Sequence, residues 1–393
     1  MNKNKLCKIA GMLLGLSIWI WPVQAQRIVT GAERMETYLP LLRHKRVALL
    51  VNQTSVVAGQ NLVDTLLKRG VHVVKIFSPE HGFRGMASAG QHVGNSIDTA
   101  TGLPVISLYG AGHYKPSATD LQDVDVLVYD IQDVGVRFYT YISSLQYLME
   151  AAAEHHLPLI VLDRPNPNGF YVDGPVLDTA YRSFVGMQPI PIVYGMTAGE
   201  YARMLNGEGW LANHAQCILK VIPCLHYTHD SLYQLPVPPS PNLRNMNAVY
   251  LYPSLCLFEG TAMSVGRGTD HPFEIFGHPD FPEQSFQFVP KSQPGALHPL
   301  YENQVCYGFS LIQSPAKTLA EIDHHLQLKW LIQAYQLFPD HAHFFNAYFQ
   351  KLAGNDDLQR QIENGLSEQA IRQSWEPALK RFLRIRAKYL LYP

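Results

Sequence analysis

A chain of 393 residues is longer than one hydrophobic core usually holds, so two domains are expected. With 47% hydrophobic and only 16% charged residues, the composition is that of a compact folded protein and not of a solvated helical scaffold. The formal net charge of −1, a pI near 7.0 and the absence of a basic block give no support to nucleic-acid binding, and no nucleic-acid partner is expected.

Residues 1–25 have the pattern of a signal peptide. Three lysines precede an apolar stretch at 9–23, and a small-residue ending at Ala25 suits signal peptidase. The apolar stretch is about 15 residues long and contains Pro22, whereas a membrane-spanning helix needs roughly 20 residues. We therefore expect cleavage after Ala25, an exported protein that is periplasmic or secreted, and no stable membrane insertion of the mature chain.

Short apolar runs recur along the first half of the chain, at 46–51, 71–77, 104–108, 125–129 and 159–162. Such runs, without alternation of polar and apolar residues, are typical of strands that are buried on both faces of a parallel sheet. Helical patterns at 61–69 and 139–155 lie between them. This alternation predicts an α/β fold with a doubly wound sheet.

The alternation weakens in the second half of the chain. The segment 235–241 contains four prolines, and such stretches are typical of semi-rigid connectors. We therefore expect an α/β catalytic domain over 26–240 and a smaller, ancillary α+β domain over 241–393. Amphipathic helices are predicted in the latter at 319–338 and 363–391.

Four cysteines remain after cleavage: Cys217, Cys224, Cys256 and Cys306. Export permits a disulfide, and Cys217 and Cys224 are close enough in the sequence to bridge a tight strand pair. Apolar neighbours favour the alternative, in which all four are small buried hydrophobic residues.

Polar side chains follow the predicted strands at their carboxyl ends, where open parallel sheets bind ligands. Glu80, His81 and Arg84 come after the strand at 71–77. A partly desolvated carboxylic acid at this position can act as a general acid or base, and the adjacent Pro79 fixes the backbone around it. The alternative is that Glu80 only pairs with Arg84 or caps the following segment.

Two further polar clusters follow the next buried strands. They consist of Asp130, Gln132, Asp133 and Arg137, and of Asp163, Arg164 and Asn166. Carboxylates combined with arginine and amide groups indicate a site for a polar organic substrate. The alternatives are an aspartate that caps the helix near residue 139 and an Asp-Arg pair that braces a loop.

In the second half, Glu259, Arg267 and Asp270 lie among glycines, which let a backbone approach a ligand closely. A structural turn is the alternative. No H-E-x-x-H pattern, G-x-G-x-x-G fingerprint or P-loop is present, so neither a metal nor a nucleotide cofactor is expected. Our hypothesis is that both halves of the chain line one cleft.

Six segments together resemble the DUF1343 family, which includes the NamZ exo-β-N-acetylmuramidases. They are 51–55 (Val-Asn-Gln-Thr-Ser), 77–85 (Phe-Ser-Pro-Glu-His-Gly-Phe-Arg-Gly), 130–141, 162–169, 238–243 and 251–261. The likeness spans nearly the whole mature chain. It implies a Rossmann-like N-terminal domain without a nucleotide and a smaller C-terminal domain that closes the cleft. It also implies removal of terminal β-linked N-acetylmuramic acid (MurNAc) from the non-reducing end of peptidoglycan fragments, without a cofactor.

Hydrolysis of a glycoside needs two carboxyl groups that flank the glycosidic oxygen. Glu80 matches the Pro-Glu-His-Gly position of the family and is the first candidate for the acid/base, and Asp130, Asp133 or Asp163 is expected to complete the pair. The lactyl carboxylate of MurNAc favours a bidentate arginine partner. The candidates for this partner are Arg84, Arg137, Arg164 and Arg267.

Other expected substrate contacts are His81, Gln132, Tyr139, Asp163, Asn166, Glu259 and Asp270, of which Tyr139 is a candidate for stacking on a sugar face. Two other functions remain open. One is a non-catalytic periplasmic protein that binds sugars or muropeptides. The other is a cell-wall hydrolase of another class. The sequence contains no G-x-S-x-G elbow, which argues against this second alternative.

Overall fold

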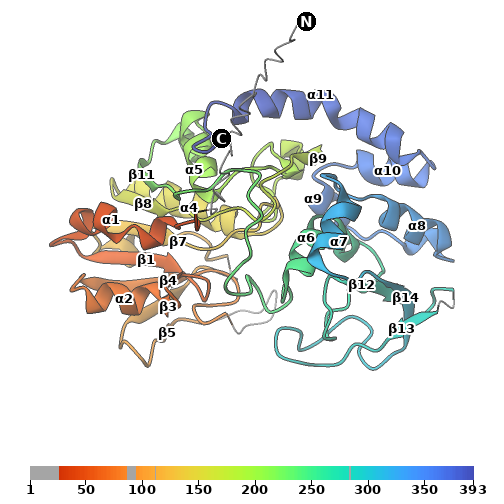
Figure 1. Cartoon of the computed structure of the whole chain (residues 1–393), viewed down its shortest axis with the longest axis horizontal. Helices are drawn as coiled ribbons and strands as arrows, with labels where there is room; N and C mark the ends of the chain where they lie inside the picture. Colours follow the sequence, from red (N-terminus) through yellow and green to blue (C-terminus); the bar gives the residue numbers. More distant parts are fainter. Residues whose placement is uncertain (1–25, 86–93, 111, 283–284) are drawn as a thin grey trace, which may run out of the picture.

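The computed structural model describes residues 26–85, 94–110, 112–282 and 285–393 (Figure 1), and the predicted signal peptide lies outside these residues. The strands are β1 (Val47–Val51), β2 (Val56–Val57), β3 (Gln60–Asn61), β4 (Val73–Ser78), β5 (Ser96–Ile97), β6 (Pro104–Ser107), β7 (Val126–Asp130), β8 (Pro158–Leu162), β9 (Asp173–Val176), β10 (Pro191–Val193), β11 (Ile218–Ile222), β12 (Ile275–His278), β13 (Phe286–Phe288) and β14 (Cys306–Ser310). The α-helices are α1 (Met35–Leu42), α2 (Leu62–Lys68), α3 (Ala118–Leu121), α4 (Tyr141–Glu154), α5 (Ala198–Gly207), α6 (Met246–Leu255), α7 (Pro315–Ile322), α8 (Lys329–Leu337), α9 (Phe349–Ala353), α10 (Asp357–Glu363) and α11 (Glu368–Arg386). Short 3₁₀ helices are η1 (Gly31–Glu33), η2 (Thr179–Tyr181), η3 (Ala212–His214), η4 (Cys256–Gly260) and η5 (His341–His343).

Seven strands form the main sheet, in the order β11-β8-β7-β1-β4-β6-β5. All neighbouring pairs are parallel except β5 and β6, which are antiparallel. The chain builds outward from β1 through β4 and β6, then returns to the other side of β1 to form β7, β8 and β11. This is the strand order of a Rossmann-like doubly wound sheet, so the predicted fold class is confirmed.

Both faces of the central strands are buried, which explains why β1 and β7 are continuous apolar runs. Val47, Leu49 and Val51 share one hydrophobic cluster with residues of α1 and α2. Ala48 and Leu50 point to the other face and belong to the cluster that contains the apolar side of α4. Because successive side chains of a strand alternate between faces, burial on both sides leaves no polar position in β1.

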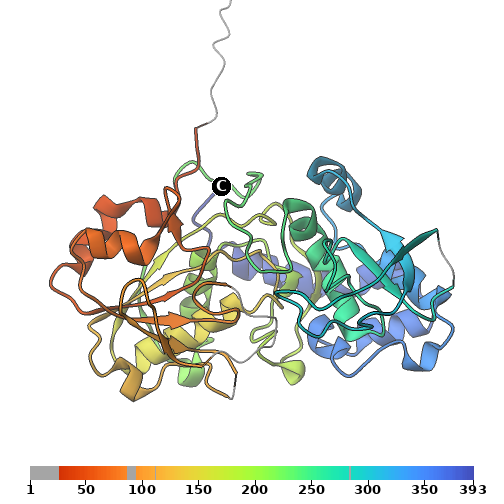
Figure 2. The same cartoon turned by 90° about the horizontal axis from the view of Figure 1, so that it is seen from below.

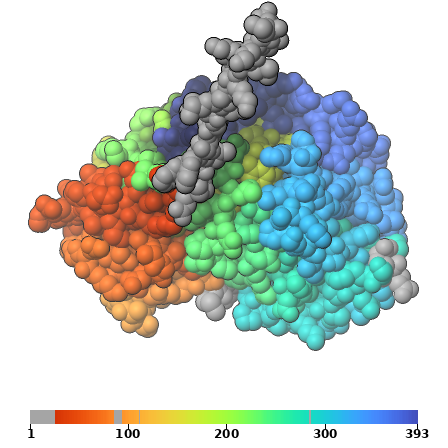
Figure 3. All heavy atoms as spheres, viewed as in Figure 1, coloured from red at the N-terminus to blue at the C-terminus, as the bar shows by residue number. Residues whose placement is uncertain are grey.

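The C-terminal part contains the antiparallel sheet β12-β14-β13 and the helices α6 to α11. The helix α11 crosses from this part back to the main sheet domain, and Figures 1 and 2 show the C-terminus beside the N-terminal part. There Tyr392 donates a hydrogen bond to Oδ2 of Asp163 at 2.6 Å, and the amide of His229 donates to the carbonyl of Pro393 at 3.0 Å. In the space-filling view the two parts are in broad contact (Figure 3).

Two helix predictions in the C-terminal part were wrong in their bounds. The pattern at 319–338 is two helices, because Asp323 and His324 adopt left-handed conformations with φ of 44° and 59° that end α7. The pattern at 363–391 is likewise interrupted. The Ser367 side chain accepts a hydrogen bond from the amide of Ala370 and so starts α11 as a separate helix.

Cys217, Cys224, Cys256 and Cys306 are free and buried, so the disulfide considered for Cys217 and Cys224 is not formed.

None of the helices in the described part of the chain is long and apolar enough to cross a membrane.

Candidate active site

A pocket of about 420 Å³ lies between the sheet domain and the C-terminal part. Its walls come from the segments after β4 and β6, the start of α4, the helices α6 and η4, and residues near α9. The lining residues are Glu80, His81, Tyr109, Phe138, Tyr139, Thr140, Tyr141, Phe184, Val185, Ser240, Tyr252, Cys256, Glu259, Arg267, Phe273, Tyr348 and Leu352. The hypothesis that both halves of the chain line one cleft agrees with this arrangement.

Glu80 enters the pocket from the turn that follows β4. The amide of Gly82 donates to the carbonyl of Pro79 at 3.0 Å, and His81 and Gly82 both have positive φ values, 68° and 75°. A left-handed conformation is uncommon for a residue with a side chain, and such strain is typical of functional sites. The hydroxyl of Thr140 donates to Oε2 of Glu80 at 2.9 Å. Thus the backbone and one hydroxyl together hold the carboxylate at the pocket wall.

Tyr109 lies beside Glu80 in the same wall. Burial raises the pKa of the Tyr109 hydroxyl, and the adjacent Glu80 carboxylate raises it further. Tyr109 therefore stays protonated at physiological pH and can act only as a neutral hydrogen-bond donor or acceptor.

The second carboxylate of the pocket, Glu259, belongs to η4 and forms an ion pair with Arg267. Nε of Arg267 donates to Oε1 of Glu259 at 2.6 Å, and each side chain is 24% exposed. The thiol of Cys256 lies 3.5 Å from Oε2 of the same carboxylate. Although burial acts to lower the pKa of Arg267, the Glu259 carboxylate raises it overall. The guanidinium carbon also lies 4.9 Å from the centre of the Phe273 ring.

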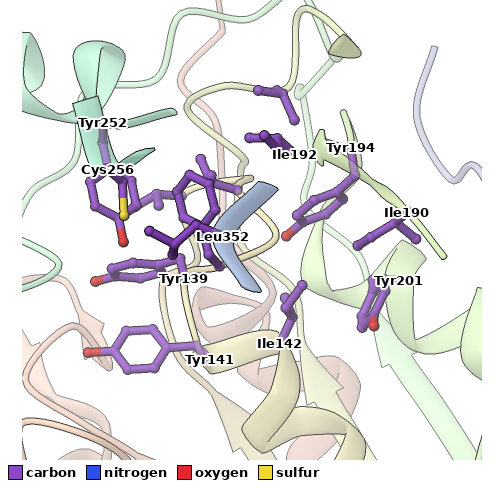
Figure 4. Close-up of a cluster of buried hydrophobic side chains, with 14 of the residues drawn as sticks. Tyr139, Tyr141, Ile142, Ile190, Ile192, Tyr194, Tyr201, Tyr252, Cys256 and Leu352 are labelled. Atoms are coloured by element: carbon purple, nitrogen blue, oxygen red, sulfur yellow. The ribbon is translucent and has the colours of Figure 1, made fainter. Parts of the chain in front are cut away.

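Tyrosines form a rigid side of the pocket. Figure 4 shows Tyr139 between Tyr141 and Tyr252, at ring-centre distances of 4.8 Å and 5.7 Å. The hydroxyls of Tyr139 and Tyr141 both donate to the carbonyl of Pro239, at 2.8 Å and 3.2 Å. Tyr139 is only 7% exposed. It therefore anchors the proline-rich segment at the pocket and presents little ring surface for the sugar stacking that we considered for it.

Asp130 and Arg164 do not line the pocket but form a buried ion pair under the strand ends. Nε and Nη2 of Arg164 donate to the two carboxylate oxygens of Asp130 at 2.6 Å and 2.9 Å. Both side chains are almost completely buried. This bidentate geometry occupies both oxygens of the Asp130 carboxylate. It matches the alternative interpretation, in which an Asp-Arg pair braces a loop.

Asp133 and Gln132 also face inward. The hydroxyl of Tyr194 and the amide of Gly135 donate to Oδ2 of Asp133, and burial raises the pKa of this carboxyl to about 6. Nε2 of Gln132 donates to the carbonyls of Asp133 and Pro165 at 2.8 Å and 2.7 Å. These residues therefore connect neighbouring loops beneath the pocket.

Asp163 and Asn166 hold the loop after β8. Oδ2 of Asp163 accepts hydrogen bonds from Thr197 and Tyr392, and burial raises the pKa of Asp163 to about 6. Nδ2 of Asn166 donates to the carbonyl of Met196 at 2.9 Å. Neither residue lines the pocket.

Arg137 is fully buried between the two parts of the molecule, where burial lowers its pKa to about 9. Its guanidinium donates to the carbonyls of Pro175, Ile190, Leu352 and Ala353, at 2.7 to 2.9 Å. The last two carbonyls belong to α9, so Arg137 joins the sheet domain to the C-terminal part.

Arg84 and Asp270 lie outside the pocket lining as well. Arg84 pairs with Asp98 at 2.7 Å. The side chain of Asp270 is 89% exposed, and its carboxylate lies 3.6 Å from Arg244. Of the arginines considered for the lactyl group, Arg267 is thus the one among the described residues that lines the pocket.

Thr140 and Tyr348 line the pocket but were not among the predicted site residues. Thr140 lies in the segment predicted as a helix over 139–155, and Tyr348 lies in no motif with a recognisable chemical role. Within the described residues, no group of three or more His, Cys, Asp or Glu side chains could hold a metal ion.

Comparison with known proteins agrees with this architecture. The family model for the N-terminal domain of the exo-β-N-acetylmuramidase NamZ matches residues 47–247, and the model for its C-terminal domain matches residues 250–392. The chain is 38% identical to the peptidoglycan β-N-acetylmuramidase NamZ of Bacillus subtilis (strain 168) over 386 residues, which covers 93% of this chain and 92% of that protein.

Two crystal structures of DUF1343 family proteins from Bacteroides fragilis NCTC 9343 are also similar. The first has 46% sequence identity and a TM-score of 0.86, and the second has 32% identity and a TM-score of 0.79. Each comparison covers 93% of this chain and 99% of the other. From these matches and from the fold, this chain belongs to the NamZ (DUF1343) family of exo-β-N-acetylmuramidases.

Proposed function

We propose that this protein is an exo-β-N-acetylmuramidase that releases terminal, β-linked MurNAc from the non-reducing end of peptidoglycan fragments. The observation that carries the proposal is a pocket between the two parts of the chain that contains two carboxylates, Glu80 and Glu259, and one arginine. The activity in the name of the Bacillus subtilis relative supports it.

Glu80 is the general acid of the proposed mechanism. Protonated, it transfers its proton to the glycosidic oxygen as the bond from that oxygen to C1 of MurNAc breaks. The oxygen of a water molecule then bonds to C1, and one proton of this water passes to Glu80, which restores the protonated acid. The hydroxyl of Thr140, 2.9 Å from Oε2, orients the carboxyl group in both halves of the cycle.

Glu259 is the second carboxylate of the proposed pair. Its ion pair with Arg267 holds it in place in the pocket, and a negative charge there stabilises the oxocarbenium-like transition state of glycoside hydrolysis. In this assignment Glu259 takes the role first considered for Asp130, Asp133 or Asp163, all of which are buried outside the pocket lining.

Arg267 recognises the lactyl carboxylate that distinguishes MurNAc from N-acetylglucosamine (GlcNAc). Its Nε is used by Glu259, and its two terminal nitrogens form no hydrogen bond with any residue that the structure describes. A guanidinium held by one edge in this way can offer the other edge to a carboxylate in a bidentate contact.

The predicted signal peptide supports the further proposal that the protein is exported and meets peptidoglycan fragments in the periplasm or outside the cell.

The test is incubation of the chain without residues 1–25 with two disaccharides of opposite order, followed by mass spectrometry. Free MurNAc is expected from MurNAc-GlcNAc, because the MurNAc is terminal at the non-reducing end. No cleavage is expected of GlcNAc-MurNAc. If a folded protein binds MurNAc-GlcNAc and leaves it intact, the proposed activity is wrong and a binding function replaces it. Cleavage of both disaccharides would contradict the exo specificity for MurNAc.

A further inference from the structure

Four half-buried aromatic side chains gather at one edge of the pocket: Tyr109, Tyr114, Tyr147 and Phe184. They come from three segments: Tyr109 and Tyr114 from the connection between β6 and α3, Tyr147 from α4, and Phe184 from the connection between β9 and β10. Tyr147 is the one residue of the stretch Tyr141–Ala152 that is not fully buried. We call these four residues the aromatic cluster.

The rings of the aromatic cluster are contiguous. The centres of Tyr114 and Phe184 are 4.3 Å apart, and their planes are nearly parallel, at 30°. Tyr147 lies 6.2 Å from Tyr114 and 6.3 Å from Phe184. Tyr109 completes the group, with its centre 5.9 Å from that of Phe184.

The aromatic cluster is continuous with the pocket and extends beyond it. Tyr109 and Phe184 are lining residues of the pocket, whereas Tyr114 and Tyr147 are not. The hydroxyls of Tyr114 and Tyr147 form no hydrogen bond with another side chain or backbone group in the described part of the chain. Two partly exposed rings with available hydroxyls thus adjoin a site for one sugar.

We infer that the aromatic cluster binds the sugars that follow the terminal MurNAc, so that the protein has additional subsites for longer glycan strands. This inference rests on the proposed function. An exo-hydrolase holds the terminal sugar in its pocket, and the rest of the strand must leave across the adjoining surface. The C–H faces of pyranose rings pack on aromatic faces, while tyrosine hydroxyls pair with sugar hydroxyls at the ring edge.

The experiment compares the disaccharide MurNAc-GlcNAc with the tetrasaccharide MurNAc-GlcNAc-MurNAc-GlcNAc in steady-state kinetics. The variants are Tyr114→Leu and Tyr147→Leu, which keep apolar bulk but remove the flat ring. Phe286→Leu is the control, because Phe286 is also half-buried beside another ring, Phe288, and lies on β13 outside the pocket lining.

We expect each tyrosine variant to raise the KM for the tetrasaccharide at least about fivefold more than the KM for the disaccharide, with kcat little changed. Phe286→Leu is expected to affect the two substrates equally. Equal effects of Tyr114→Leu and Tyr147→Leu on both substrates would overturn the inference.

Binding of the tetrasaccharide to the Glu80→Gln protein, measured by calorimetry with and without Tyr114→Leu, separates the inference from the proposed function. Weaker tetrasaccharide binding with Tyr114→Leu supports the subsites even if the native protein releases no MurNAc. Unchanged binding overturns the subsites even if the native protein is an active muramidase. If Tyr114→Leu fails to fold, Tyr147→Leu gives the same comparison from α4.

Discussion

The hydroxyl of Thr140 donates a hydrogen bond to Oε2 of Glu80 across 2.9 Å, and so connects the start of α4 to the turn after β4. Thr140 occupies the N-cap position of α4, where a threonine usually bonds to the backbone of the first helical turn. Its side chain makes no such bond. The hydroxyl serves the pocket carboxylate instead of the helix, which makes Thr140 a positioning residue for Glu80.

Thr140→Val is expected to lower kcat/KM at least about tenfold, because the carboxylate that forms as Glu80 gives up its proton loses a hydrogen bond, and one to a charged group contributes roughly 1.5–3 kcal/mol. The melting temperature should change little, since no capping bond is lost. Thr197→Val is the matched control. Thr197 does cap α5, accepting from the amide of Glu200, and it also donates to the buried Asp163 at 2.7 Å, so this variant is expected to lose at least about 1 kcal/mol of stability. Native activity of Thr140→Val would contradict the role assigned to it.

Arg267→Lys is expected to abolish the preference for MurNAc over GlcNAc as a competitive inhibitor. Lysine keeps the positive charge but cannot form the bidentate contact, so inhibition by MurNAc should weaken at least about tenfold. Arg84→Lys is the control, because Arg84 pairs with Asp98 outside the pocket lining. A retained preference in Arg267→Lys would show that another group reads the lactyl carboxylate.

Asp133 is expected to make the protein less stable as the pH rises from about 4 to about 6. Burial raises the pKa of this carboxyl to about 6 in the folded state, above its value in the unfolded chain. The folded state therefore binds the proton more tightly, and this contribution to stability is present at low pH and lost as the pH rises through the folded pKa. Its size is up to about 3 kcal/mol.

The measurement for Asp133 is chemical denaturation of the native and Asp133→Asn proteins across this pH range. Other groups titrate in both proteins, so the difference between the two curves isolates Asp133. The native protein should lose stability relative to Asp133→Asn between pH 4 and 6. Parallel curves would contradict the raised pKa.

Tyr392→Phe is expected to destabilise the fold by about 1–3 kcal/mol, because the lost hydroxyl donates to Asp163 and accepts from the amide of Cys224, both buried. The effect should appear in the midpoint of denaturation. Tyr389→Phe loses only a hydrogen bond to the partly exposed Glu208 and should cost less. Equal losses of stability in the two variants would contradict the role of Tyr392 in fastening the C-terminus to the sheet domain.

The centre of the main sheet was predictable from the sequence because burial on both faces makes its strands continuous apolar runs, and β1, β4, β7 and β8 lie within about two residues of the predicted runs. The breaks that separate α7 from α8 were not predictable by periodicity. Left-handed residues such as Asp323 interrupt a helix without altering its apolar pattern.

The candidate site was predictable only in part. Glu80 and Arg267 stand beside glycines or prolines that mark an unusual backbone, and both line the pocket. The sequence could not show that both oxygens of Asp130 accept hydrogen bonds from Arg164, because Asp130 and Arg164 each follow a strand just as Glu80 does. Which carboxylate faces solvent depends on internal partners that are distant in the chain.

The central claim is that Glu80 protonates the leaving group, and the most direct test is the effect of Glu80→Gln on two substrates with different leaving groups. On MurNAc-GlcNAc, whose leaving sugar needs a proton, kcat/KM should fall at least about 10². On para-nitrophenyl β-MurNAc, whose leaving group departs readily as an anion, the fall should be much smaller. Equal losses on the two substrates, or near-native activity of the folded variant on the disaccharide, would contradict the account.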